Sequence, residues 1–202
     1  MQEKIKKPTN LHKLVILARK NADFFQDLDR RAYARITKGD QRGELYPLDS
    51  SCFENWLSAI NFKVHDEVAN SKLKLDAREH LEVESRLSGK NYNVGLRVIS
   101  NEEFIEIDLG DQDWKSVQIT KDGWRVRAHK NFFYRNNSIK ALPVPCKDKL
   151  DDDWVESIFN ISGNNQSMLI MGWLVGCFMS EGPRPMLVIQ GEQGSGKSFL
   201  AS

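Results

Sequence analysis

The stretch that decides the expected fold is Gly191-Glu192-Gln193-Gly194-Ser195-Gly196-Lys197-Ser198. It satisfies the pattern GxxxxGK[ST], the signature of a phosphate-binding loop, or Walker A motif. In such a loop the glycines let successive backbone N–H groups point at phosphate oxygens, and the following helix N-terminus adds positive potential. The pattern predicts that these eight residues cradle the phosphates of a nucleotide.

The residues on both sides of the octet support this prediction. A phosphate loop follows a buried strand and opens a helix. The apolar run from Pro185 to Gln190 predicts the strand, and residues 199 to 201 predict the start of the helix. Lys197 is expected to reach the β- and γ-phosphates, and the Ser198 hydroxyl is expected to bind Mg²⁺. The predicted cofactors are therefore ATP and Mg²⁺; the alternative is a glycine turn that binds nothing.

The segment before the octet predicts the start of an α/β domain. Residues 165 to 180 are apolar on nearly every side, which predicts a helix buried against a sheet. Residues 1 to 150 carry 27 basic and 22 acidic groups, whereas residues 151 to 202 carry 2 and 6. We predict an α+β accessory domain over residues 1–148 and the N-terminal part of an α/β P-loop ATPase domain over residues 149–202.

The accessory region shows two kinds of periodicity. Helical spacing predicts helices at residues 11–20, at the apolar stripe that starts at Phe53, and within residues 66–88, with Ser51 and Glu54 at capping-box spacing. A hairpin is expected over residues 23–37. Alternating apolar residues then predict an antiparallel meander over residues 91–145, with strands near 92–100, 105–109 and 124–128.

Two further clusters are weighed as possible sites. Residues 124 to 140 interleave arginines and lysines with Trp124 and three aromatics at residues 132–134, a mixture that can stack bases and track phosphates. The competing interpretation is a hairpin with its aromatics turned inward. The carboxylates Glu106, Asp108, Asp111 and Asp113 lack calcium-loop spacing, so a solvated turn is expected.

Composition excludes several protein classes. The 202 residues are 40% hydrophobic and 28% charged, ordinary values for a globular protein and unlike those of a disordered chain or a coiled coil. The three cysteines form no CxxC pair, which argues against a disulfide framework or a cysteine zinc site. The longest mainly apolar run, 168–179, is too short for a membrane span. We expect a cytoplasmic protein without membrane contact.

The order of these elements also resembles a known family. The meander, the Leu142-Pro143-Val144-Pro145 connection, the apolar helix and the strand before the octet are similar to the ATPase modules of phages, plasmids and other mobile elements, of the superfamily 3 and virulence-associated primase-helicase types. The resemblance implies a DNA replication protein that binds ATP, acts on DNA as a helicase, and commonly assembles as a homo-oligomeric ring. Only the octet residues carry over from the family.

The sequence leads to two competing hypotheses. The first is that the chain is the ATP-binding part of a mobile-element replication ATPase, truncated after the Walker A motif, because the family's other catalytic positions would lie beyond Ser202. Such a chain is expected to bind MgATP weakly and not to turn it over. The alternative is a nucleic-acid-binding or assembly module with a vestigial P-loop.

Overall fold

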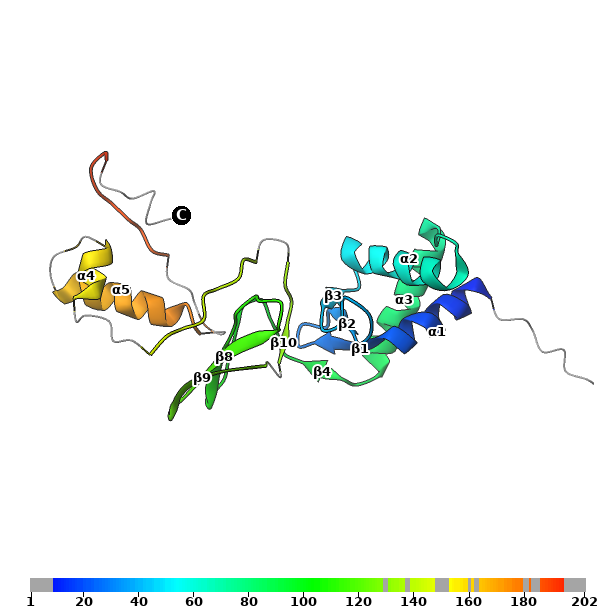
Figure 1. Cartoon of the computed structure of the whole chain (residues 1–202), viewed down its shortest axis with the longest axis horizontal. Coiled ribbons are helices and arrows are strands. Elements are labelled where there is room, and N and C mark those ends of the chain that lie inside the picture. The colour runs from blue at the N-terminus through cyan, green and yellow to red at the C-terminus, as the bar shows by residue number, and fades with distance from the viewer. Residues whose placement is uncertain are drawn as a thin grey trace, which may run out of the picture. The chain divides into compact units, whose positions relative to one another are not determined.

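The computed structural model describes residues 9–128, 131–136, 139–147, 153–159, 161, 164–179, 182 and 186–194. The chain forms two compact units, one from Met1–Arg97 and His129–Lys140, the other from Val98–Ala128 and Ala141–Ser202. Both helices and sheets are present (Figure 1). This confirms the mixed α and β character that the sequence predicted, whereas the P-loop ATPase fold stays a prediction.

The first unit contains a four-stranded sheet. Strands β1 (Ala22–Asp27) and β2 (Ala32–Ile36) pair antiparallel and confirm the predicted hairpin. Strand β3 (Leu45–Pro47) pairs antiparallel with β2, and β4 (Asn91–Tyr92) pairs in parallel with β1. The strand order is β3-β2-β1-β4, so β1 and β2 lie in the middle of the sheet.

Three helices cover one face of this sheet (Figure 1). They are α1 (Asn10–Asn21), α2 (Ser51–His65) and α3 (Ser71–Leu87), close to the predicted ranges. Their apolar stripes and the facing strand residues form one core, because burial of an apolar stripe is what stabilises an amphipathic helix. Fully buried members of that core include Leu14, Ala34, Phe53, Leu57, Ala77 and Leu81.

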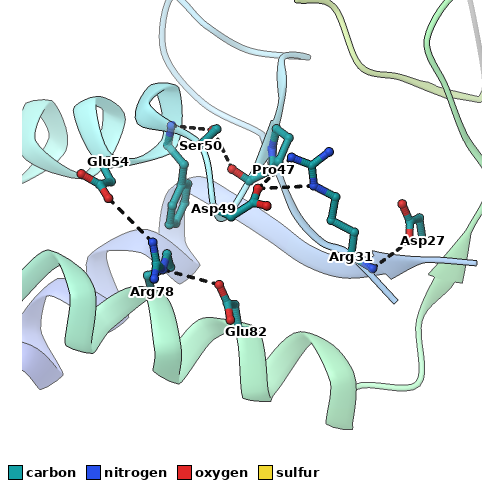
Figure 2. Close-up of polar contacts among 9 residues, drawn as sticks. Asp27, Arg31, Pro47, Asp49, Ser50, Glu54, Arg78 and Glu82 are labelled. Atoms are coloured by element: carbon teal, nitrogen blue, oxygen red, sulfur yellow. Dashed lines mark hydrogen bonds and ion pairs between the residues drawn. The ribbon is translucent and has the colours of Figure 1, made fainter. Parts of the chain in front are cut away.

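The start of α2 corrects the predicted cap by one residue. Ser50, not Ser51, is the N-cap: its Oγ accepts a hydrogen bond from the Phe53 N–H at 3.2 Å, and its hydroxyl donates to the Pro47 carbonyl at 2.6 Å (Figure 2). Ser50 has the extended backbone that a cap requires, whereas Ser51 is already helical. The sequence contains two adjacent candidate serines, and the turn after β3 selects between them.

Ion pairs connect the elements around this cap (Figure 2). Arg31, in the hairpin connection, donates to Asp49 at 2.9 Å. Arg78 of α3 lies between Glu54 of α2, at 3.8 Å, and Glu82, at 3.5 Å. Because Asp49 and Glu54 are substantially exposed, such pairs contribute little to the free energy of unfolding, and the apolar core dominates.

The expected strand over residues 92–100 is wrong as a single element. The segment divides into β4, β5 (Val94–Gly95) and β6 (Val98–Ser100), which belong to three different sheets. β5 pairs in parallel with β10 (Phe132–Phe133). The chain bends at residues 96–97, where Leu96 is exposed, and a bend interrupts the regular alternation that a continuous strand would keep.

The second unit contains an antiparallel meander, as predicted. Strands β6, β7 (Phe104–Asp108), β8 (Lys115–Thr120) and β9 (Gly123–Ala128) pair in sequence order. One face of the sheet is apolar and includes Ile107 and Val117, both buried. The other face carries polar side chains, among them Glu106, Ser116 and Gln118.

Two helices follow the meander. α4 (Trp154–Phe159) and α5 (Asn164–Gly176) confirm the predicted helical segments. The predicted burial of the second helix is wrong, because Met168 and Leu169 are 72% and 74% exposed. An all-round apolar helix is buried only where other elements surround it, and the contacts of α5 are mainly with α4. In the described part of the chain no helix combines the length and apolarity that crossing a membrane requires.

Candidate functional site

The first half of the predicted phosphate loop lies within the described residues. Residues 191–194 are exposed and turn at Gln193 and Gly194. Gly194 has a φ of +86°, and the position of a Cβ there is open space. A left-handed backbone conformation favours glycine and suits a loop that turns its N–H groups inward. Ser195, Gly196, Lys197 and Ser198, which carry the predicted Mg²⁺ and phosphate contacts, lie outside the described residues.

The segment before the loop departs from the expectation. Residues 186–190 form no strand, and Met186 and Val188 are 87% and 66% exposed. A strand exists through hydrogen bonds to a neighbouring strand, and no strand of the described chain pairs with this segment. The predicted buried strand at Pro185–Gln190 is therefore wrong for residues 186–190, although their apolar sequence is that of a strand; Pro185 lies outside the described residues.

The basic and aromatic stretch from residue 124 to 140 is not one hairpin. Trp124, Arg125 and Arg127 lie on β9 of the second unit, whereas Phe132 and Phe133 form β10 of the first unit. Both interpretations offered for the stretch treated it as continuous. The structure separates it because β10 leaves the meander and pairs with β5.

The first sheet carries an aromatic cluster on the face opposite its helices. Phe25 of β1 meets the ring of Tyr92 edge-on at 5.1 Å and the ring of Phe132 at 4.7 Å, measured between ring centroids. Tyr92 and Phe132 are themselves 4.7 Å apart. Phe25 is buried, whereas Tyr92 is 41% exposed. We call Phe25, Tyr92 and Phe132 the aromatic platform.

Two cations stand at the edge of the aromatic platform. The Arg35 guanidinium lies 5.2 Å from the centroid of the Phe132 ring, a cation–π distance. Arg35 and Lys90 line a small cavity of about 130 Å³ together with Tyr92, Phe132 and Asp23. Arg35 and Lys90 are exposed. Neither side chain forms an ion pair within the described residues, which leaves both charges available to a ligand.

Backbone pairing holds the platform in place. The Gln26 N–H donates to the Lys90 carbonyl at 3.1 Å, and the Gln26 side chain donates to the Asn91 side chain at 2.7 Å. Asp27 is the register partner of Tyr92 in the parallel pair of β1 and β4. Tyr92 and Lys90 therefore occupy fixed positions beside β1, rather than on a free loop.

The second sheet presents a different polar arrangement. Glu106 and Asp108 of β7 are fully buried, which corrects the predicted solvated turn for these two residues. The Ser116 hydroxyl donates to Glu106 Oε1 at 2.5 Å, and Arg127 lies 3.4 Å from Glu106 Oε2. Sequence alternation suggested a half-exposed face, but a carboxylate can be buried where hydrogen-bond donors surround it, as Ser116 and Arg127 surround Glu106.

Of the two remaining carboxylates, only Asp113 matches the expected solvated turn, because Asp111 is half-buried and accepts a hydrogen bond from the Lys115 N–H at 2.8 Å. Asp113 is exposed and accepts a hydrogen bond from Lys115 at 2.6 Å, which holds the pKa of Asp113 below its ordinary value. No group of three or more histidine, cysteine or carboxylate side chains could hold a metal ion among the residues that the structure describes. The Mg²⁺ prediction thus depends on Ser198 and the nucleotide phosphates, and it stays a prediction.

Burial raises the pKa of two tyrosines in the first sheet. Burial, followed by the charge of Asp27, raises the pKa of the Tyr33 phenol to about 12. Burial, followed by a hydrogen bond to Glu44, raises the pKa of Tyr46 well above its ordinary value. Both phenols are neutral at physiological pH, so they serve as packed rings and hydrogen-bond donors rather than as acids or bases.

No protein-family model, curated protein or solved structure matches the chain. The resemblance to primase-helicases remains a prediction from the motifs.

The aromatic platform is the site that sequence reasoning missed. Its members come from β1, β4 and β10, which are separated by tens of residues. One signal was present: Tyr92 and Val94 alternate with polar residues, which indicated an apolar strand face, whereas the adjacent Phe24 and Phe25 do not show which ring faces the helices. Only the parallel pairings of β4 and β10 bring those faces together.

Proposed function

We propose that the chain binds ATP with Mg²⁺ at residues 191–198, as part of a DNA replication ATPase of the mobile-element primase-helicase type. The observation that carries the proposal is the complete GxxxxGK[ST] pattern. The exposure of residues 191–194 and the left-handed Gly194 support it, because a phosphate loop must be both accessible and tightly turned.

In this proposal different residues of the octet contact the phosphates and the Mg²⁺ ion. The backbone N–H groups from Gly191 to Gly196 surround the β-phosphate, and the Lys197 ammonium neutralises the β- and γ-phosphates. The Ser198 hydroxyl completes the Mg²⁺ shell. DNA is the proposed partner of the ATPase, and a homo-oligomeric ring is its proposed assembly.

Isothermal titration calorimetry with MgATP tests the proposal on the full chain. Binding is expected, and Lys197→Ala is expected to weaken it roughly tenfold or more, because a charge-assisted contact is lost. Lys121→Ala, which removes the same charge from an exposed turn, is the matched control and should leave binding unchanged. Equal ATP binding by the wild type and Lys197→Ala would contradict the proposal.

Phosphate release on the same preparation separates binding from turnover. No sustained hydrolysis is expected, because phosphoryl transfer needs a positioned metal, water and charge-stabilising groups together. Sustained turnover that Lys197→Ala abolishes would contradict this expectation and would show that residues of this chain supply the groups needed for hydrolysis. Absence of ATP binding, combined with salt-sensitive nucleic-acid binding that Lys197→Ala does not change, would favour the alternative of a vestigial loop.

A further inference from the structure

The exposed side of Tyr92 is the part of the aromatic platform that a ligand can reach. The Tyr92 ring packs against Phe25 and Phe132, at 5.1 Å and 4.7 Å between ring centroids, and 41% of the residue remains exposed. Because neighbouring rings already restrict its rotation, the Tyr92 side chain loses little conformational entropy when a base stacks on it. Aromatic side chains stack nucleobases at about 1–3 kcal/mol per base.

The positive charges of Arg35 and Lys90 beside this ring can attract an anion. Arg35 is the register partner of Asp23 on β1, yet its guanidinium lies over the Phe132 ring instead of forming an ion pair within the described residues. Lys90 lines the same cavity. An arginine stacked on a ring keeps its N–H edge available, and that edge matches the geometry of phosphate oxygens.

The size of the cavity indicates what can enter it. Its volume is about 130 Å³. Protein cavities of about 150 Å³ accept one benzene molecule, so this space suits the edge of a single ring rather than a stacked base pair. A base with both faces free is found in a single strand, whereas bases in a duplex are already stacked.

We propose that the aromatic platform, on the face of the first sheet opposite its helices, binds a single strand of nucleic acid. One base stacks on Tyr92, and Arg35 and Lys90 contact the flanking phosphates. Phosphate contacts supply affinity and stacking supplies the preference for unpaired bases. The proposal concerns a site separate from residues 191–198 and does not rest on ATP binding.

Fluorescence anisotropy of a labelled dT oligonucleotide of about 15 nucleotides, titrated with the full chain at low salt, tests the site. Tyr92→Ala should weaken binding roughly tenfold, the equivalent of one lost stacked base. Tyr92→Phe keeps the ring and should bind as the wild type does. Arg35→Ala should weaken binding and lower the slope of log affinity against log salt by about 0.7, the value for one phosphate contact on a single strand.

A variant that binds the oligonucleotide more tightly gives a second test, because misfolding would weaken binding rather than strengthen it. Asp23 lines the same cavity, and its carboxylate repels phosphate. Asp23→Asn should therefore tighten oligonucleotide binding several-fold. Unchanged or weaker binding by a folded Asp23→Asn variant would count against phosphate contact at this cavity.

Matched controls distinguish this surface from others. Lys38→Ala removes an exposed charge from the connection between β2 and β3, and Trp124→Ala removes an exposed aromatic from β9 of the other unit. Both should bind the oligonucleotide as the wild type does. Lys197→Ala should also leave it unchanged, so failure of the phosphate-loop proposal and failure of this one are distinguishable.

Three results would overturn the proposal. One is equal binding by Tyr92→Ala and the wild type. Another is equal affinity for a duplex of the same sequence, which offers no free base. The third is displacement of the oligonucleotide by polyglutamate of equal charge, which would show that charge alone accounts for the binding.

Discussion

The two sheets use the same residue types in opposite ways. In the first sheet Arg35 faces Asp23 across the strands, forms no ion pair within the described residues and rests on the Phe132 ring. In the second sheet Arg127 reaches the fully buried Glu106 at 3.4 Å. The arginine of the first sheet remains exposed, and the arginine of the second is mostly buried.

Burial of the partner explains the difference. A buried carboxylate requires donors, so Arg127 and Ser116 are committed to Glu106 and serve stability. Asp23 is exposed and solvated, so it places no such demand on Arg35. The first sheet therefore leaves the Arg35 charge accessible to solvent, whereas the second sheet uses the Arg127 charge to pair a buried carboxylate.

The largest expected effect concerns the aromatic platform itself. Phe25→Ala removes a buried ring that contacts three other aromatic side chains and should cost about 3–5 kcal/mol in the free energy of unfolding. Urea unfolding followed by circular dichroism measures it. Leu28→Ala, at an exposed hairpin position, should change stability by less than about 0.5 kcal/mol. Similar costs for the two variants would show that the platform is not packed.

The next effect concerns the buried carboxylate of the second sheet. Glu106→Ala leaves the Arg127 charge without its carboxylate partner and should cost about 3 kcal/mol, the lower end for breaking a buried pair. The same urea titration detects it. Glu102→Ala, on the exposed turn before β7, is the control. If Glu106→Ala lowered the free energy of unfolding no more than the control does, the pair of Glu106 and Arg127 would not stabilise the second sheet.

A direct comparison of the two arginines gives a smaller difference. Arg127→Ala should cost about 2 kcal/mol, because Glu106 then lacks one donor. Arg35→Ala should cost less than about 1 kcal/mol, the value of an exposed cation–π contact. Thermal unfolding of the two variants side by side measures both. A greater loss in Arg35→Ala would reverse the proposed assignment of binding charge and structural charge.

The smallest effect appears only at high pH. Burial raises the pKa of Tyr33 from its ordinary 10.0 to about 12, so the folded state retains the phenol proton longer than the unfolded state. The stabilisation is therefore complete below pH 10 and is lost as the pH rises through 12. The difference in tyrosinate absorbance between the wild type and Tyr33→Phe measures the ionisation. A midpoint near 10 would mean that water reaches this ring.

Local sequence signals were sufficient where neighbouring residues carry the interaction. The helix stripe of Phe53, Trp56 and Leu57, and the hairpin of β1 and β2, follow from periodicity and turn residues. Gly89 has a φ of +67° directly after the Ser88 cap, a position at which glycine commonly ends a helix. These features need only contacts between residues close in the chain.

Other features depended on distant partners. The strand expected before the phosphate loop, and the buried helix before it, require neighbouring elements that the described chain does not place around them. Apolar residues indicate a capacity to be buried, but burial itself is a property of the surroundings. The sequence therefore predicted the apolar composition of residues 165–179 and 186–190 without predicting that large apolar side chains among them are exposed.

The phosphate-loop pattern, the three helices of the first unit with their amphipathic faces, and the hairpin of β1 and β2 follow from the sequence alone, because each depends on the spacing of residues close in the chain. The contacts of Tyr92 and Phe132 with Phe25, and the burial of Glu106 beside Arg127, arise in the tertiary structure and have no local signal in the sequence. The physical reason is that strand pairing joins residues far apart in the chain, and a side chain's role follows from the neighbours that pairing provides.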